Sequence, residues 1–89
     1  MRSFSEHLPN NLRFLRKYYD YTQKELAEPF EVSQEGYSKW ERGISIPSIR
    51  RLQKIANFYK IETSDLLNKK PEDILLILLE RKKSQIKKI

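Results

Sequence analysis

This chain of 89 residues is long enough for one small domain, because a chain of such length buries only roughly 60% of its unfolded surface on folding. Its composition, 34% charged and 38% hydrophobic, is typical of a folded globular protein, and the lack of cysteine excludes disulfides and thiolate metal sites. The net charge of +6 is concentrated in residues 81–89, which carry five basic groups and no acid, so that residues 1–80 hold 13 basic and 12 acidic groups.

The first two predicted elements are helices, since glycine is scarce and no stretch alternates apolar and polar residues as a strand would. The first helix is expected over 9–19. Its apolar positions recur at spacings of three and four, at Leu12, Leu15 and Tyr19. A second helix is expected from Thr22 through Phe30. Its start matches a capping box, in which Thr22 and Glu25 satisfy each other's free backbone N–H groups.

Serines mark the starts of the next two helices. Ser33 is placed to cap a third helix that runs to Arg42, and Gly43 is the expected left-handed stop. Ser48 opens a fourth helix after a loop at 44–47. The apolar positions that keep the helical period in this fourth helix are Ile49, Leu52, Ile55, Ala56 and Tyr59.

Two further helices complete the chain. A short one is expected over 64–68. Pro71 then favours the start of a sixth, because proline suits the first turn of a helix, and acids at its start and basic groups at its end suit the helix dipole. One boundary is indicated, and it divides a domain at 1–70 from a C-terminal helix at 71–89.

Only three residues, 31–33, separate the second and third helices, a spacing typical of a helix-turn-helix whose second member can enter a DNA major groove. In that member Tyr37 and Trp40 are expected to face inward, together with Val32 and Ile44. The opposite side carries the polar residues Gln34, Glu35, Ser38, Lys39 and Arg42. Such side chains can hydrogen-bond to base edges or phosphates, although a helix surface in water is polar for that reason alone.

Several motifs over residues 8–67 occur together in order and spacing: "TQKELA", "VSQ", "SKWERG", the Pro47-Ser48 step, "KIANFYKI" and "DLL". In these motifs the chain resembles the Cro and phage-repressor helix-turn-helix family, often called the XRE family. The resemblance implies an all-helical, compact, lambda-repressor-like bundle of five helices, to which this chain adds a C-terminal helix. It also implies binding to double-stranded DNA.

Carried over residue by residue, the resemblance implies a surface for DNA. The positions that would face the bases are Gln34, Glu35, Ser38 and Lys39. The positions that would contact phosphates are Gln23, Arg42, Ser45, Arg50 and Arg51. For each arginine, a solvated surface charge is the alternative interpretation.

The chemistry of three of these side chains follows from the residues themselves. Gln34 offers a donor and an acceptor together, which suits adenine, and Lys39 can donate to guanine acceptors. Glu35 only accepts, so phosphate would repel it. It can take a hydrogen bond from a cytosine amino group or pair with Lys39 four residues on, and we favour the internal pair.

Three residues depart from the family pattern around the turn. Glu31 stands where glycine is usual, so it must either accept a positive φ or bend the turn differently. Pro29 costs roughly 3 kcal/mol in a helix interior, which favours an end of the second helix near Glu28. Gly36 costs about 1 kcal/mol relative to alanine, and either a close backbone approach or packing against the second helix explains it.

The apolar run at 74–79 wraps the sixth helix, so one contact with the bundle is not expected to bury all of it. The positions that alternate at spacings of four and three, like a coiled-coil seam, are Leu75, Leu79, Lys82, Ile86 and Ile89. We expect a homodimer through the four apolar ones, because paired recognition helices read the half-sites of an inverted repeat about 10 base pairs apart. A different protein partner is one alternative. A membrane-surface helix is another, against which the wrapped apolar run argues.

These features predict a dimeric transcriptional repressor that binds a specific sequence of double-stranded DNA. The alternative is a protein-interaction module or antitoxin with weak or no DNA binding of its own. Its support is the nearly neutral charge of residues 1–80, the acidic Glu35, and the replacement of glycine by Glu31 in the turn. No enzyme, cofactor or metal site is expected, because the chain has one histidine, no glycine-rich phosphate loop and no acidic pair in an apolar setting. A cytoplasmic location is expected, since a bilayer span needs about 20 apolar residues and the start lacks signal-peptide features.

Overall fold

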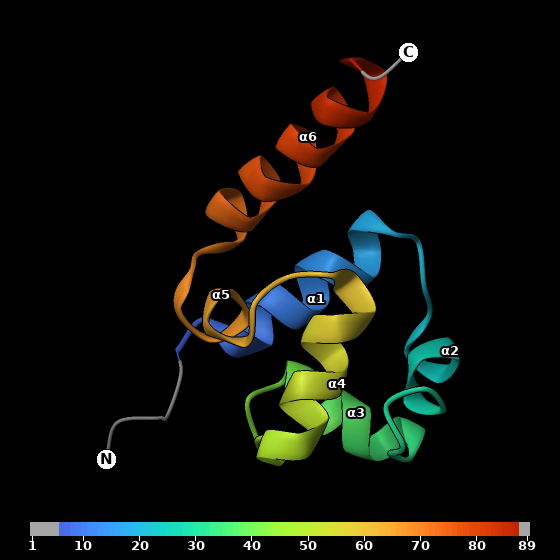
Figure 1. Ribbon diagram of the computed structural model, residues 1–89. Coiled ribbons are helices and arrows are strands. Elements are labelled where there is room, and N and C mark those ends of the chain that lie inside the picture. The colour runs from blue at the N-terminus through green and yellow to red at the C-terminus, as the bar shows by residue number, and fades with distance from the viewer. Residues whose placement is uncertain (1–5, 88–89) are drawn as a thin grey trace.

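The structure is a computed structural model that describes residues 6–87, with side chains through residue 83, and those residues form helices and no strand. In chain order the helices are α1 (Leu8–Tyr18), α2 (Gln23–Ala27), α3 (Gln34–Glu41), α4 (Ile49–Tyr59), α5 (Thr63–Asn68) and α6 (Pro71–Lys87). The predicted all-helical class is confirmed. Figure 1 shows α1 to α5 gathered into a bundle, with the later part of α6 projecting from it on the side away from α2 and α3.

The helix starts are those that the capping residues predict. The Thr22 hydroxyl accepts a hydrogen bond from the Glu25 N–H at 3.1 Å, and the Glu25 carboxylate accepts one from the Thr22 N–H at 2.9 Å. Ser33 and Ser48 likewise accept from the N–H groups three residues later, at 3.0 and 3.3 Å. Each cap satisfies a backbone donor that the helix leaves free.

The helix boundaries differ from expectation by small shifts. Both α1 and α5 begin one residue earlier than predicted. The second helix ends at Ala27 and does not reach Phe30, in agreement with the break that Pro29 favours, because proline fits poorly inside a helix. Residues 88 and 89 of the predicted sixth helix lie outside the described part of the chain.

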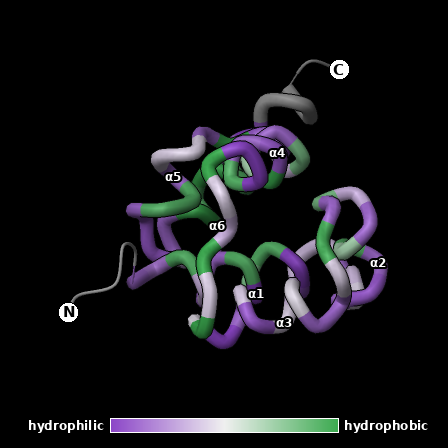
Figure 2. The backbone as a smooth tube through the Cα atoms, turned by 90° about the horizontal axis from the view of Figure 1, so that it is seen from below, coloured by the Kyte–Doolittle hydropathy of each residue, from purple (hydrophilic) through white to green (hydrophobic). Residues whose placement is uncertain are grey.

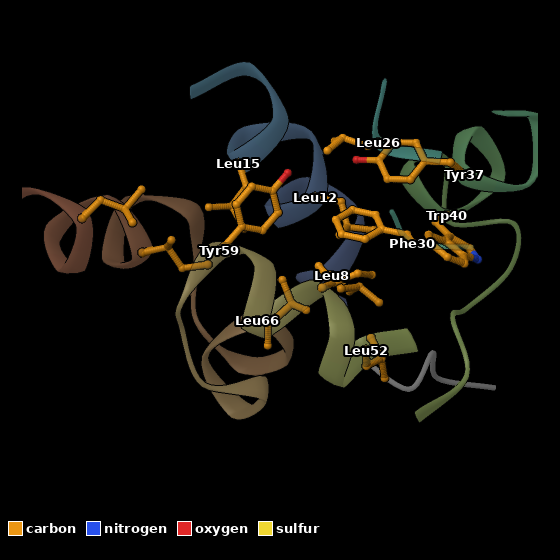
Figure 3. Packing of buried hydrophobic residues seen from close by; sticks show 14 residues of the cluster. Leu8, Leu12, Leu15, Leu26, Phe30, Tyr37, Trp40, Leu52, Tyr59 and Leu66 are labelled. Carbon is orange, nitrogen blue, oxygen red and sulfur yellow. The ribbon is translucent and has the colours of Figure 1, made fainter. Parts of the chain in front are cut away.

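The hydrophobic core draws side chains from every helix (Figure 3). Tyr37 and Trp40 reach inward from α3 as predicted, with ring centroids 5.8 Å apart, and Tyr37 also packs on Phe30 at 6.2 Å. This burial of Tyr37 and Trp40 fixes the orientation of α3.

Buried Asn11 adds a polar contact between two other helices. Its Nδ2 donates to the Leu66 carbonyl at 2.8 Å and so joins α1 to α5.

The first turns of α6 belong to the same core. Ile74 and Leu78 are buried in it, whereas the run around them is partly exposed. Arg81 then donates to the carbonyls of Lys60 and Tyr59, at 2.6 and 3.2 Å, where α4 ends. A cation is favourable at a helix C-terminus, so Arg81 both caps α4 and fixes the direction of α6.

Candidate nucleic-acid interface

Glu31 adopts the strained conformation that glycine usually supplies in this turn. Its φ is +59°, so the chain accepts a left-handed residue and does not bend the turn differently. The Glu31 N–H donates to the Glu28 carbonyl at 3.0 Å, and the Val32 N–H donates to the Ala27 carbonyl at 3.0 Å. These bonds close the end of α2 and lead the chain into α3.

Side chains from α4 hold Glu31 in place. Arg51 donates through Nε and Nη2 to the Glu31 carbonyl, at 3.1 and 2.8 Å. The Glu31 carboxylate pairs with Arg50 at 3.0 Å and Lys54 at 3.6 Å. The hydrogen bond from Arg50, followed by the charge of Lys54, holds the pKa of Glu31 below its ordinary value. Arg50 and Arg51, both candidate phosphate contacts, thus already have partners in the free protein.

The outer face of α3 carries the predicted base-reading side chains. Gln34, Glu35 and Lys39 are exposed, and Ser38 is half-buried. Figure 2 shows hydrophilic residues along much of α2 and α3 on the outside of the bundle. The helix therefore divides into a buried aromatic side and a polar side that faces solvent.

Glu35 pairs with Arg42 and not with Lys39. The distance from the Arg42 Nη2 to the Glu35 Oε2 is 3.0 Å, and the Arg42 Nε donates to the Ser38 hydroxyl at 3.2 Å. Residues seven apart lie two turns along one side of a helix, and the long guanidinium side chain spans that distance. The pair between Glu35 and Lys39 that the sequence favoured is therefore wrong, because Arg42 is the cation that Glu35 binds.

Gly36 makes room for the turn. A Cβ at this position would lie 2.6 Å from the Val32 Cγ2 and 3.1 Å from the Ser33 Oγ, both of which precede α3. The atoms that need this room are side-chain atoms of the turn, so neither a close backbone approach nor packing against α2, the two explanations offered from the sequence, describes the contact. A side chain here would push α3 from its N-cap.

Buried Glu41 is the polar residue of α3 that the sequence reasoning missed. It is 2% exposed, and its carboxylate accepts from Arg16 Nε at 2.7 Å and Nη2 at 3.1 Å. Gln23, a candidate phosphate contact, donates its Nε2 to the same carboxylate at 3.0 Å. The signal was its position four residues after inward-facing Tyr37, which places it on the buried side. It joins α1, α2 and α3.

The ionisation of this buried group is controlled by its neighbours. Burial by itself raises the pKa of Glu41, but hydrogen bonds from Arg16 and Gln23 outweigh it, so the net pKa lies below the ordinary value. Burial, followed by the nearby Glu41 carboxylate, raises the pKa of the Tyr37 hydroxyl. Glu41 is therefore an anion and Tyr37 a neutral phenol at neutral pH.

The loop after α3 and the first residue of α4 expose apolar side chains that were expected to be covered. Ile44, predicted to face inward, is 60% exposed, because Gly43 with a φ of +74° ends α3 and turns the chain outward. Ile49, predicted on the apolar face of α4, is also exposed, since it is the first residue of that helix and precedes its contact with the core. Ser45, a candidate phosphate contact, is exposed in the same loop.

The predicted dimer seam on α6 is only partly described. Leu75 is half-buried and Leu79 is 43% exposed. Leu76, which was not on the predicted seam, is 60% exposed. The side chain of Ile86 and the whole of Ile89 lie outside the described residues.

A membrane-spanning helix and a metal site are both absent from the described part of the chain. Across residues 6–87, no helix is long and apolar enough to cross a membrane. Over the same range, no three histidine, cysteine, aspartate or glutamate side chains gather where they would hold a metal ion.

The family assignment rests on a match over most of the bundle. The helix-turn-helix family model matches residues 12–66. This chain belongs to the helix-turn-helix family. The match covers α2, the turn and α3, and it confirms the Cro and phage-repressor resemblance that the motifs predicted.

Two curated relatives share the helix-turn-helix segment. The HTH-type transcriptional activator BcrR of Enterococcus faecalis is 33% identical over 78 residues, which are 88% of this chain and 37% of that protein. The HTH-type transcriptional regulator ImmR of Bacillus subtilis (strain 168) is 36% identical over 62 residues, which are 70% of this chain and 49% of that protein. The chain thus spans less than half the length of either curated relative.

Two solved structures share the fold. A transcriptional regulator from Listeria innocua superposes with a TM-score of 0.67 at 21% identity, covering 68% of this chain and 57% of that one. The DNA-binding domain of the P22 c2 repressor superposes with a TM-score of 0.64 at 23% identity, covering 73% of this chain and 86% of that one. The predicted lambda-repressor-like architecture is confirmed.

Proposed function

We propose that this helix-turn-helix protein regulates transcription by binding a specific sequence of double-stranded DNA with α3 in the major groove. One observation carries the proposal: Tyr37 and Trp40 fasten α3 to the core, while Gln34, Glu35 and Lys39 extend to solvent on its other side. A recognition helix held in this way presents polar side chains to base edges. The names of the two relatives, a transcriptional activator and a transcriptional regulator, support the same class of function.

The base-reading roles that we propose follow from hydrogen-bonding chemistry. Gln34 suits adenine, because its amide offers a donor and an acceptor side by side, and Lys39 suits the acceptors of guanine. The Ser38 hydroxyl can hydrogen-bond to either a donor or an acceptor on a base edge, and Glu35 suits the amino group of cytosine. Each correct pairing contributes roughly 1–3 kcal/mol of discrimination against the wrong base.

The phosphate-contacting roles surround α3. The residues that we propose for them are Gln23, Arg42, Ser45, Arg50 and Arg51. Gln23 donates one amide N–H to Glu41, and its second N–H stays available, since an amide nitrogen carries two. The arginines would exchange a carboxylate or carbonyl partner for phosphate oxygens.

A dimer suits this mode of binding. We propose that two copies associate through α6, as expected from Leu75, Leu79, Ile86 and Ile89, and read an inverted repeat. We further propose that the protein acts in the cytoplasm as a repressor, by occupying a promoter or operator, and that it binds DNA without catalysing a reaction or needing a cofactor.

The experiment that tests this function is selection of bound sequences from a random duplex pool, followed by affinity measurements at two salt concentrations. We expect an enriched inverted repeat. Binding should weaken steeply with salt, because contact with phosphates releases counterions. An inverted repeat would also support the dimer.

Matched variants then test the residue roles. Lys39→Gln should change the preferred base at one position of each half-site. Arg42→Gln should weaken binding to the selected site and reduce the salt slope on that site by about 0.9. Lys83→Gln removes the same charge from an exposed position in α6, the helix whose later part projects away from α3 (Figure 1), and should change neither. Absence of enrichment from a folded sample would overturn the proposal in favour of a protein-interaction module.

A further inference from the structure

Arg42, a cation that contacts two of the base-reading side chains, has an internal anion as its partner. Arg42 is bound to the Glu35 carboxylate at 3.0 Å and to the Ser38 hydroxyl at 3.2 Å. The side chains of Arg42 and Glu35 are 49% and 70% exposed, so the pair lies on the surface of α3. Three candidate DNA contacts are therefore joined in one cluster before any DNA is present.

The fold does not require this ion pair. Exposed pairs contribute about 0.2–1 kcal/mol to stability, and α3 is already held by buried aromatic side chains and by Glu41. On DNA the pair has a larger consequence, because Arg42 cannot give its full charge to a phosphate while Glu35 holds it. A carboxylate left alone beside phosphates would also be repelled.

Glu35 has a favourable alternative partner only at certain sequences. A carboxylate accepts hydrogen bonds and cannot donate them at neutral pH, so in the major groove it needs an amino group, which cytosine provides. Where no such donor is within reach, the best partner of Glu35 is still Arg42. Where a donor is present, Glu35 can turn to the base and leave Arg42 free for a phosphate.

Resting on the proposed DNA binding, we propose that Glu35 determines specificity by holding Arg42 back from nonspecific DNA and releasing it when a base donor engages the carboxylate. Base recognition and one phosphate contact are thus coupled through a single ion pair. The coupling predicts that the specific complex neutralises one more phosphate than the nonspecific complex.

The test compares salt dependence on two duplexes, one carrying a site selected by the protein and one with the same bases in scrambled order. For the unsubstituted protein, the slope of log affinity against log salt should be steeper on the selected duplex by about 0.9, the contribution of one phosphate. In Glu35→Gln, the nonspecific slope should steepen by about 0.9 and the difference should disappear. Nonspecific affinity should rise about threefold to tenfold, and the specificity ratio should fall accordingly.

Two controls separate this mechanism from a general effect of charge. Glu62→Gln makes the same change in net charge at an exposed N-cap that forms no side-chain cap hydrogen bond, so it should leave the difference in slopes intact. In an Arg42→Gln background, Glu35→Gln should no longer steepen the nonspecific slope, since no held cation remains.

The outcomes distinguish this inference from the function on which it rests. If Glu35→Gln strengthens binding to both duplexes by one factor, or acts equally without Arg42, the coupling is wrong while DNA binding stands. If the unsubstituted protein prefers neither duplex, the proposed function fails and the coupling fails with it.

Discussion

Gly36 is the residue at which a missing side chain decides how α3 meets the turn. An added Cβ would lie 2.6 Å from the Val32 Cγ2. We expect Gly36→Ala to lower the free energy of unfolding by about 1 kcal/mol, because an overpacking cost of about 1–3 kcal/mol exceeds the gain of about 1 kcal/mol in helix propensity. Unfolding in urea, followed by circular dichroism, measures the change.

A second background supplies the control for Gly36. Val32→Ala removes the nearer of the two atoms that the new Cβ would meet and leaves the Ser33 Oγ at 3.1 Å, so Gly36→Ala made in that variant should raise the free energy of unfolding by about 0.5 kcal/mol. The reversal of sign is the distinguishing result. A loss of the same size in both backgrounds would show that the clash with Val32 is not the reason for glycine.

Single residues were predictable from sequence where local chemistry decides their place. The 3.6-residue period placed Tyr37 and Trp40 inward, as found. The departure from glycine at Glu31 left a positive φ or a different bend as alternatives, and the structure has the positive φ. Glu41 was missed because a charge is expected outside unless its partner is known, and Arg16 comes from a distant segment. The partner of Glu35 was missed because side-chain reach, and not spacing alone, selects Arg42.

At the scale of the element, α6 has two apolar sides with different surroundings. Ile74 and Leu78 are buried against the bundle, whereas Leu76 and Leu79 are 60% and 43% exposed. We expect the doubly substituted Leu76→Glu, Leu79→Glu protein to be a folded monomer at concentrations where the unsubstituted chain is dimeric, because charges in an apolar contact oppose association. Sedimentation equilibrium measures the state, and circular dichroism checks the fold.

An exposed isoleucine outside α6 provides the comparison for this prediction. Ile49→Glu introduces the same charge at a position that is 73% exposed, and it should leave the oligomeric state unchanged. If Ile49→Glu dissociated the dimer and the α6 substitutions did not, the dimer contact would lie beside the α3–α4 loop and not on α6. A monomeric unsubstituted chain would remove the dimer from the proposal.

Element boundaries were more predictable than element contacts. Thr22, Ser33 and Ser48 start their helices as expected, because capping is a local hydrogen-bonding pattern that a sequence displays. The run at 74–79 offered no such signal, since six consecutive apolar residues fit either the bundle or a partner. Which of them are buried is decided by the packing of α6 on α1, and by Arg81 at the end of α4.

At the scale of the whole molecule, one buried charge links three helices. Glu41 in α3 binds Arg16 from α1 and Gln23 from α2, and it is 2% exposed. Its pKa is lower in the folded state than its ordinary value of 4.5, so folding favours the ionised form. The stability that results is complete above the unfolded-state pKa and is lost as the pH falls through the lower folded-state pKa.

Protonation of Glu41 in acid should therefore lower the free energy of unfolding. Glu41→Gln should remove part of this pH dependence. At pH 7 we expect this variant to lose about 3 kcal/mol of unfolding free energy, because Arg16 keeps its charge in a largely buried place without an anion. The two proteins should begin to converge as the pH falls below about 4.5 and should meet only below the lower folded-state pKa of Glu41, where protonation removes the same charge from the folded unsubstituted chain. Urea unfolding between pH 7 and pH 3 measures both effects, with Glu62→Gln as the exposed comparison that retains the full dependence. Parallel curves for the unsubstituted protein and Glu41→Gln would show that other carboxylates, such as paired Glu31, carry the acid sensitivity.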